Sequence, residues 1–315
     1  MEGSMTWNCN NISRRYFMGG VASLVTVGAT GTARAAASQF KTITPGVLTV
    51  AAFGEMPASG IEDGKLVGLD GDMIMAIAPK LGLTVKPLVM DNAATIESVV
   101  SGRADIMIGN MRWTSRRAAV MALSDAAYYV TYGSVTRKDS KLPNVVAISD
   151  LKGQRLATLT GAASSTDLKK VPDSGGVRFY DNSDAVIRDI IAGRVDFASL
   201  DPTMIAYLGS KNPGLNLKHI TYKPDPEYPT LTGSSQAVFG MPLANPDLVD
   251  AVNAGLAWLK RNKQDRAIFA KYGLTDELYF TPLAENPRIG VDRDTSGNVT
   301  GPAAHKPKDF SALFS

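Results

Sequence analysis

Apolar residues recur along this chain in two alternating patterns, short β-rich runs and longer stretches with apolar positions three to four residues apart. Val47–Phe53 is the first β-rich run. Ile74, Ile77 and Leu81 then mark one face of a helix that ends at Gly82. Strands and helices that alternate in this way predict a mainly parallel sheet. In this first unit the pattern predicts strands at 47–53, 83–89 and 104–108, and helices around 74–81 and 95–101.

The same alternation resumes after Tyr128. Further along, Gln236–Met241 is predicted to form one strand. Asn245–Arg261 is predicted to form a long helix, with acidic residues near its start and basic residues at its end, which suits the helix dipole. We expect this last part of the chain to return to the first unit. The other predicted elements are strands at 155–160, 177–180, 195–200 and 215–221, and helices opening at 161–164, at 185–192 and at 268–272.

Two segments of the chain resemble each other, with the shared cores Gly102-Arg103-Ala104-Asp105 and Gly193-Arg194-Val195-Asp196. Each copy has a helical apolar face, then a glycine that stops the helix, then a short apolar strand. We expect Asp105 and Asp196 to organise turns instead of touching a ligand. Ligands of open α/β sheets bind beyond the carboxyl ends of strands, so the repeat predicts two lobes that face one cleft. The polar residues that follow the strands are Asn110, Arg112 and Arg117 in the first copy and Asp201 in the second.

The composition is that of an ordinary globular protein, with 44% hydrophobic and 20% charged residues. A length of 315 residues suits one large or two moderate domains. The net charge is only +3 and no cationic block occurs, so nothing in the sequence supports nucleic-acid binding.

The sequence carries no motif for catalysis or for a cofactor: G-x-S-x-G, P-loop and G-x-G-x-x-G patterns are all missing. We therefore expect no catalytic residue and no cofactor. Its two histidines, His219 and His305, lie far apart and without carboxylate or cysteine clusters, so no metal site is expected. Asp292–Gly297 mimics the start of a calcium loop. Ala303 stands where that loop needs a glutamate, so a turn is predicted.

Residues 1–35 have the order of a twin-arginine export signal. Ser13–Met18 contains the arginine pair and the following aromatic, and a weakly apolar stretch continues to Gly31. Ala33-Arg34-Ala35 offers a cleavage site, with Ala35–Ala37 as the alternative. We expect removal of this signal to leave a soluble periplasmic protein that is nearly neutral. The one cysteine, Cys9, would leave with the signal, so no disulfide is expected.

Six motifs follow one another in an order that resembles the polar amino-acid periplasmic binding proteins of bacterial ABC transporters, the family 3 type. The resemblance covers roughly residues 45–280 and implies an α/β fold of type II. In this fold each of two lobes is a mainly parallel sheet flanked by helices, and two hinge strands join the lobes. It implies a first lobe from 40–131 and 237–283, a second lobe from 132–236, and a polar C-terminal tail at 284–315. The six motifs are 64–70, 102–117, 124–129, 150–155, 193–201 and 252–256.

The resemblance also implies two ligand-binding residues. Arg117 falls where the family arginine binds the ligand α-carboxylate, and a guanidinium fork suits that group. Asp201 falls where the family aspartate accepts the α-ammonium. Asp201 precedes Pro202, so it also fits as the cap of a following helix, and the two roles are compatible. Of the pair Arg116 and Arg117, one is expected to be a solvated surface charge.

Several positions depart from the family pattern. Asn110 and Arg112 stand where small hydroxyl residues or glycine are common. Two interpretations of Arg112 are open: it binds a second anionic group, or it is a salt-bridged residue of the cleft wall. The extra arginine disfavours a cationic ligand and favours an acidic or polar amino acid, or a related carboxylate.

The contacts expected from stacking side chains and from the second lobe are also unusual. Asn92 occupies one position where the family has an aromatic residue, and Phe53 and Met56 are the candidates at the other. Phe53 fits equally as a core residue. In the second lobe, Ala163 would contact a ligand through its backbone N–H at a helix start, together with Ser164.

These observations predict a monomeric receptor that traps a small ligand between its lobes and presents it to the membrane permease of an ABC transporter, without chemistry. Two alternatives are open. One is an enzyme on the same fold, a periplasmic cyclohexadienyl-type dehydratase, for which Glu55 would be the acid. The other is a sensory receptor for a membrane-bound signalling domain.

Overall fold

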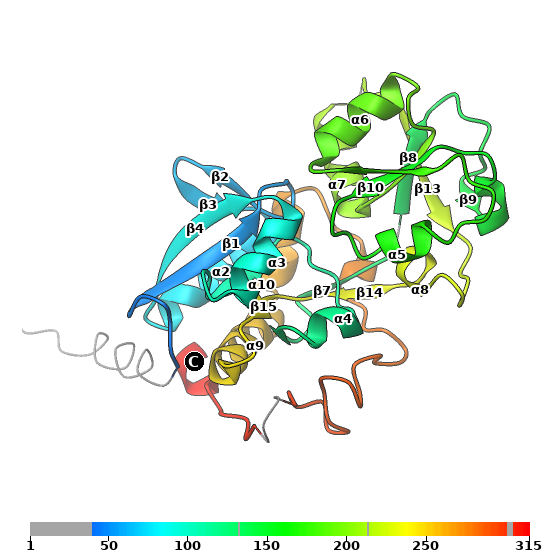
Figure 1. The fold of residues 1–315 in the computed structure, drawn as a ribbon. Helices are drawn as coiled ribbons and strands as arrows, with labels where there is room; N and C mark the ends of the chain where they lie inside the picture. The colour runs from blue at the N-terminus through cyan, green and yellow to red at the C-terminus, as the bar shows by residue number, and fades with distance from the viewer. Residues whose placement is uncertain (1–39, 132, 213, 301–304) are drawn as a thin grey trace, which may run out of the picture.

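The protein consists of two α/β lobes, seen on the left and the upper right of Figure 1. The structure, a computed structural model, describes residues 40–131, 133–212, 214–300 and 305–315. The predicted export signal, its cleavage site, Cys9 and Ala303 lie outside the described residues. Within the described ranges, no helix is long and apolar enough to cross a membrane.

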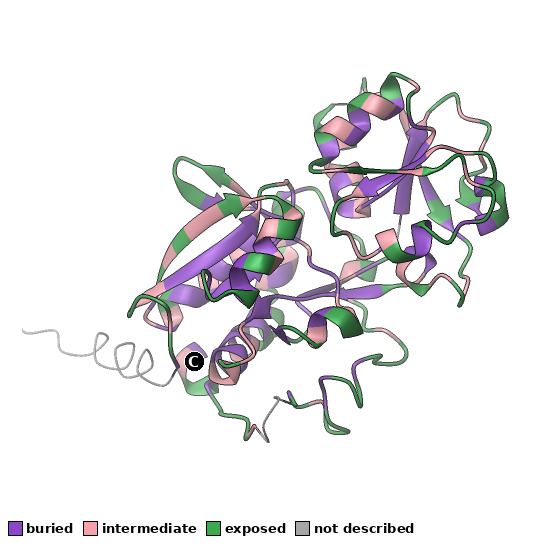
Figure 2. Ribbon diagram, viewed as in Figure 1, coloured by how far each residue is buried: buried purple, intermediate pink, exposed green. Residues whose placement is uncertain are grey.

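The first lobe is built on a five-stranded sheet with the order β4-β1-β5-β15-β6. Of its three parallel strands, β1 and β5 have almost wholly buried centres (Figure 2), because helices cover both faces, whereas the edge strand β4 is only partly buried. Helices α2, α9 and α10 pack on one face and α3 on the other. The strands are β1 (Val47–Phe53), β4 (Thr84–Met90), β5 (Ile106–Ile108), β6 (Ala122–Leu123) and β15 (Gly240–Met241), and a hairpin adds β2 (Gly60–Glu62) and β3 (Lys65–Val67). The helices are α2 (Leu69–Lys80), α3 (Asn92–Val100), α4 (Ser115–Ala118), α9 (Pro246–Arg261) and α10 (Gln264–Lys271).

The second lobe is built on a six-stranded sheet with the order β11-β10-β12-β8-β13-β9. Strands β11, β10 and β12 run parallel, and β8 is antiparallel to both of its neighbours. The strands are β8 (Gly133–Arg137), β9 (Val145–Val146), β10 (Leu156–Leu159), β11 (Val177–Tyr180), β12 (Phe197–Leu200) and β13 (Leu217–Tyr222). The helices are η1 (Ile148–Leu151), α5 (Ser165–Leu168), α6 (Ser183–Ile191), α7 (Pro202–Lys211) and α8 (Pro229–Thr232).

The two repeated segments form the same unit in each lobe, α3–β5 and α6–β12. Gly102 and Gly193 have φ of 72° and 67°, a left-handed conformation that favours glycine and ends each helix. Asp105 accepts from the amide of Thr49 at 2.8 Å, and Asp196 accepts from the amide of Arg155 at 3.0 Å. Each aspartate thereby ties the start of its strand to the neighbouring parallel strand. The predicted structural role of both aspartates is confirmed.

Two antiparallel strands, β7 (Tyr128–Val130) and β14 (Ser235–Ala237), form the hinge between the lobes (Figure 1). The prediction of one strand over Gln236–Met241 is wrong, because this run is divided between β14 in the hinge and β15 in the first lobe. At the break, the amide of Val238 bonds to the carbonyl of Met111 at 2.8 Å. The chain therefore changes partners there and passes from one sheet to another.

The C-terminal segment 284–315 is more than the polar tail that was expected. Arg288 and Arg293 are 1% and 2% exposed, although both are charged. Arg288 Nη2 lies 2.6 Å from Asp292 Oδ2, and Arg288 Nη1 donates to the carbonyl of Ser124 at 2.6 Å. Arg293 Nη2 donates to the carbonyl of Leu123 at 2.8 Å. The segment is thus docked on the end of β6 through buried guanidinium groups.

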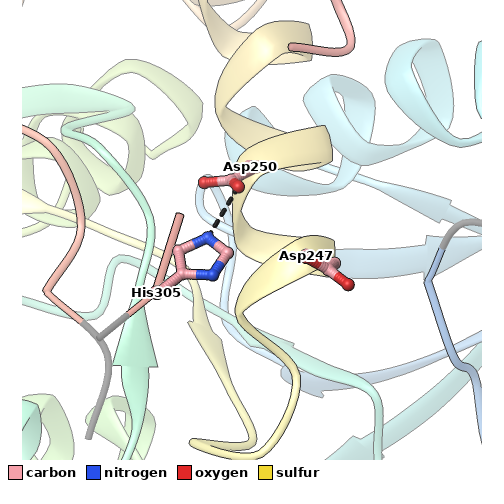
Figure 3. Close-up of side chains that lie close together, drawn as sticks. All are labelled: Asp247, Asp250 and His305. Atoms are coloured by element: carbon pink, nitrogen blue, oxygen red, sulfur yellow. Dashed lines mark hydrogen bonds and ion pairs between the residues drawn. The ribbon is translucent and has the colours of Figure 1, made fainter. Parts of the chain in front are cut away.

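The end of the chain docks on α9 (Figure 3). His305 Nε2 lies 2.7 Å from Asp250 Oδ2, so the expectation that this histidine has no carboxylate neighbour is wrong. Asp247, Asp250 and His305 are residue types that bind metals. However, Lys308 donates through its amide to Asp250 and through Nζ to Asp247, both at 2.8 Å. The ammonium of Lys308 thus already pairs with Asp247, and we interpret the cluster as an anchor for the last short helix, η3 (Ser311–Phe314).

Short 3-10 helices and a turn complete the later part of the chain. Helix η2 spans Glu277–Tyr279. Asp294 accepts from the amides of Ser296 and Asn298 at 2.8 and 2.9 Å. The turn predicted within Asp292–Gly297 is therefore confirmed.

Candidate functional site

A cavity of about 100 Å³ lies between the lobes, at the carboxyl ends of parallel strands from both sheets. Strand ends converge there because β1, β4 and β5 run in the same direction in the first sheet, as do β10, β11 and β12 in the second. All nine residues proposed from the sequence line this one cavity. From the first lobe these are Phe53, Met56, Asn92, Asn110, Arg112 and Arg117, and from the second lobe Ala163, Ser164 and Asp201.

The loop after β5 forms the floor of the cavity in an unusual backbone conformation. Gly109 and Asn110 have φ of 126° and 53°. A Cβ atom on Gly109 would lie 2.5 Å from the Cβ of Phe53, so only glycine fits. Asp70 Oδ2 accepts from the amides of both loop residues, at 2.8 Å from Gly109 and 2.6 Å from Asn110. The carboxylate of Asp70 therefore fixes the loop that carries Asn110 and leads to Arg112.

Asp70 is fully buried, which raises its pKa to about 6 against the opposing effect of the two amide hydrogen bonds. The negative charge of Asp201 raises this pKa further. Among the described residues, Asn110 Oδ1 is a buried oxygen atom without a hydrogen-bond partner. The side-chain oxygen of Asn110 is thus an acceptor available at the cavity.

Arg117 is the buried member of the arginine pair, whereas Arg116 is exposed, as predicted for one of the two. Thr114 caps the short helix α4 and fixes the position of Arg117. Arg117 Nη1 donates to the carbonyl of Arg112 at 2.6 Å, and Nη2 donates to the carbonyl of Gly161 in the second lobe at 3.0 Å. The guanidinium therefore spans the cleft.

Arg112 and Asp201 form an ion pair across the cleft, with Arg112 Nη2 at 2.7 Å from Asp201 Oδ2. Arg112 Nη1 also donates to the carbonyl of Thr131 at 3.2 Å. The other carboxylate oxygen of Asp201 caps α7, where it accepts from the amide of Thr203 at 2.8 Å and from the Thr203 hydroxyl. The structure shows Arg112 as a salt-bridged residue of the cleft wall, which was one of its two open interpretations. The capping role of Asp201 is also present.

The remaining proposed residues lie around the rim and the second-lobe wall. Phe53 and Met56 are half-buried, so Phe53 is not a core residue. Asn92 Nδ2 donates to the carbonyl of Thr160 in the opposite lobe at 3.1 Å. Ser164 Oγ lies 3.2 Å from Thr158 Oγ1. The helix expected to open at 161–164 begins at Ser165 and has only four residues.

Glu55 adds a contact between the lobes that the sequence did not predict. Its carboxylate accepts from the amide of Ser183 at 2.6 Å and from the Ser183 hydroxyl, at the start of α6. Burial raises the pKa of Glu55, partly offset by these hydrogen bonds. Glu55, Asn92, Arg112 and Arg117 each bridge the lobes, so the structure shows a closed cleft.

Sequence reasoning missed Asp70 and Ser183 as residues that shape the site. Asp70 is the last residue of the first family motif, 64–70. It lies in the first turn of α2, and nothing in that position predicted its hydrogen bond to Gly109, which is 39 residues further along the chain. The left-handed backbone at Asn110, which a hydrogen-bond partner stabilises, is visible only in the structure, so nothing in the sequence signalled this contact. Ser183 carried no signal, because only lobe closure brings it to Glu55.

Comparisons with known proteins agree with this geometry. A family model described as bacterial extracellular solute-binding proteins, family 3, matches residues 48–275. The probable amino-acid-binding protein YxeM of Bacillus subtilis is 26% identical over 176 residues, which are 55% of this chain and 65% of the relative. The glutamine-binding protein of Geobacillus stearothermophilus is 24% identical over 174 residues, 52% of this chain and 63% of the relative. This chain thus spans just under two thirds of the length of these relatives.

Solved structures resemble the fold over a larger part of their length. An ancestral arginine-binding protein has been solved with arginine and with glutamine bound. These two structures match with TM-scores of 0.63 and 0.64 at 25% and 26% identity, covering 72% and 73% of this chain and 98% of theirs. An ancestral amino-acid-binding protein that is a precursor of cyclohexadienyl dehydratase matches with a TM-score of 0.62 at 22% identity, over 72% of this chain and 95% of its own. At this identity the likeness shows the fold alone.

Proposed function

The chain belongs to family 3 of the bacterial extracellular solute-binding proteins, and from this we propose that its cleft captures a small amino-acid-like ligand that carries a carboxylate. The observation that carries the proposal is the buried Arg117 in a cavity lined by both lobes. Its planar guanidinium spans the cleft and suits a carboxylate. A ligand held there contacts both lobes and favours their closure.

We further propose that the protein is exported to the periplasm and works as a monomer that presents its ligand to an ABC permease. Names of relatives support the ligand class: YxeM is named a probable amino-acid-binding protein and the Geobacillus protein a glutamine-binding protein. The proposed role is binding without chemistry, which separates it from an enzyme on the same fold.

A thermal-shift panel of the proteinogenic amino acids and small dicarboxylates tests the proposed function. A ligand that binds only the folded form stabilises it by mass action, by about 2.7 kcal/mol at a hundred-fold excess over Kd. We expect a clear rise in melting temperature with at least one member. If no compound at millimolar concentration shifts the melting temperature, the proposed ligand class is wrong.

Arg117→Ala tests the site itself. We expect affinity for the best ligand to fall about 100-fold, because the charged hydrogen bonds to the carboxylate are lost. The circular dichroism spectrum should stay that of the folded protein. Arg116→Ala is the matched control, since this neighbour is exposed and lies outside the cavity. If both variants bind the ligand with the same affinity, Arg117 does not bind the ligand carboxylate.

Glu55 supports a second candidate function, the dehydratase. It lines the cavity, and burial raises its pKa, as a general acid requires. In the closed structure both of its oxygens accept hydrogen bonds from Ser183, which leaves them engaged in a contact between the lobes. Incubation with prephenate or arogenate, with ultraviolet detection of the product, distinguishes the two functions.

A further inference from the structure

Four charged side chains line the cavity: Glu55, Arg112, Arg117 and Asp201. The charge of a ligand must be complementary to those of these four side chains, after their ion pairs and hydrogen bonds within the protein are taken into account. In the described part of the chain, both anionic groups at the cavity have protein partners. Asp201 is paired with Arg112, and Glu55 with Ser183.

Asp201 has little capacity for a ligand cation. One of its oxygens accepts from the amide and hydroxyl of Thr203, and the other accepts from Arg112 Nη2 at 2.7 Å. An ammonium placed beside Asp201 would also lie beside the guanidinium of Arg112. Attraction to the carboxylate and repulsion from the guanidinium act over similar distances and largely cancel.

Glu55 does not replace Asp201 as a partner for a cation. Its two oxygens accept from the amide and the hydroxyl of Ser183, the first residue of α6. Both carboxylates that line the cavity are therefore already engaged by other groups of the protein.

The cavity still offers a neutral acceptor. Asn110 lines it, and its side-chain oxygen is buried without a hydrogen-bond partner among the described residues. A neutral hydroxyl can donate to this oxygen without the repulsion that an ammonium meets from Arg112. A buried acceptor left unpaired would disfavour a ligand that has no donor at all.

We infer that Arg112 is a specificity-determining residue, which occupies Asp201 and makes the cleft prefer hydroxy-carboxylates to the corresponding amino acids. The inference rests on the proposed function, since it names the ligand class of the same site. Arg117 holds the carboxylate, Asn110 accepts from the hydroxyl, and Arg112 removes the attraction for an ammonium.

Isothermal titration calorimetry with isosteric ligand pairs tests the inference. The pairs are L-glutamate with 2-hydroxyglutarate, L-aspartate with malate, and L-alanine with lactate, which differ only in ammonium against hydroxyl. We expect the hydroxy acid to bind at least 10-fold more tightly in every pair that binds measurably. A smaller ratio, or a preference for the amino acid, overturns the inference and leaves the proposed function standing. No binding by either member of any pair overturns the inference, and the thermal-shift panel then decides separately whether the proposed function stands.

Arg112→Ser shows whether this arginine sets the preference. Without the guanidinium, Asp201 becomes an available anion, so the preference should shift toward the amino acid by at least 10-fold. Arg112→Lys keeps a cation beside Asp201 and should keep the direction of the preference. Arg116→Ser controls for loss of a positive charge outside the cavity. If the ratio in Arg112→Ser equals that of the parent protein, Arg112 does not determine specificity and the inference fails.

Discussion

Asp70 is a buried carboxylic acid whose two oxygens differ in their surroundings. One oxygen holds the cleft loop through two amides, and the carboxyl group also interacts with the buried hydroxyl of Tyr128. Burial raises its pKa from 3.8 to about 6. The native state therefore binds a proton at Asp70 more readily than the unfolded state does.

This shift predicts how stability depends on pH. Asp70 is protonated in both states well below pH 4 and ionised in both well above pH 6, so its ionisation destabilises the native state increasingly between these values. The free energy of unfolding of the parent, relative to Asp70→Asn, should fall by about 2 kcal/mol as pH rises from 4 to 7. Urea unfolding of both proteins across this range measures the difference. A difference that does not change with pH would contradict the raised pKa.

The repeated helix–strand units use an aspartate in the same way, but in different surroundings. Asp105 is 3% exposed and accepts from the amides of Ile43 and Thr49. Asp196 is less buried and binds Arg155 through its amide and its guanidinium. Removal of Asp105 leaves the buried amide of Thr49 without its partner, whereas the amide of Ile43 belongs to an exposed residue that water can reach.

We expect Asp105→Ala to lower the free energy of unfolding by about 1 to 3 kcal/mol, the cost of leaving the buried amide of Thr49 unsatisfied. Asp196→Ala is the matched substitution in the other lobe and should cost less, because the guanidinium of Arg155 is 44% exposed and can be solvated. Chemical denaturation of the two variants makes the comparison. An equal or larger loss in Asp196→Ala would show that burial does not set the difference.

The molecule as a whole is two lobes and a hinge, with the C-terminal segment added to the first lobe. Arg288 reaches Gln236 of β14 as well as the end of β6, and Trp113 Nε1 donates to Asp292 at 3.2 Å. The segment thus contacts the hinge strand β14, and it contacts Trp113, which follows Arg112 in the sequence. It lies beyond the part of the chain that the family model matches, residues 48–275.

Arg288→Met should destabilise the whole molecule by about 3 to 5 kcal/mol, because the buried Asp292 loses a partner and two carbonyls lose a donor. Arg266→Met is the control, since Arg266 forms an exposed ion pair with Glu277 and should change stability little. Thermal or chemical unfolding measures both. If the two variants are equally stable, the C-terminal segment does not brace the first lobe.

At the scale of the whole molecule, the sequence by itself determined the order of the elements and the place of the site. Strands β1 and β11 lie at the predicted bounds, and most other predicted elements lie close to theirs, because periodicity and glycine positions are local properties of the chain. The strand predicted over Gln236–Met241 is the exception, since it is divided between two sheets. The nine proposed residues share one cavity because parallel sheets bring their carboxyl strand ends together. The role of each residue toward a ligand stays a prediction.

Only the tertiary structure decided which charged groups meet. Arg112 and Asp201 are 89 residues apart and pair because the lobes close on each other. Arg288 and Arg293 are buried because a segment of polar composition docks on carbonyls at a strand end. Hydrophobic periodicity records which face of an element is buried. It holds no information on which polar atoms meet across two lobes, since that depends on distances set by the packing of the whole chain.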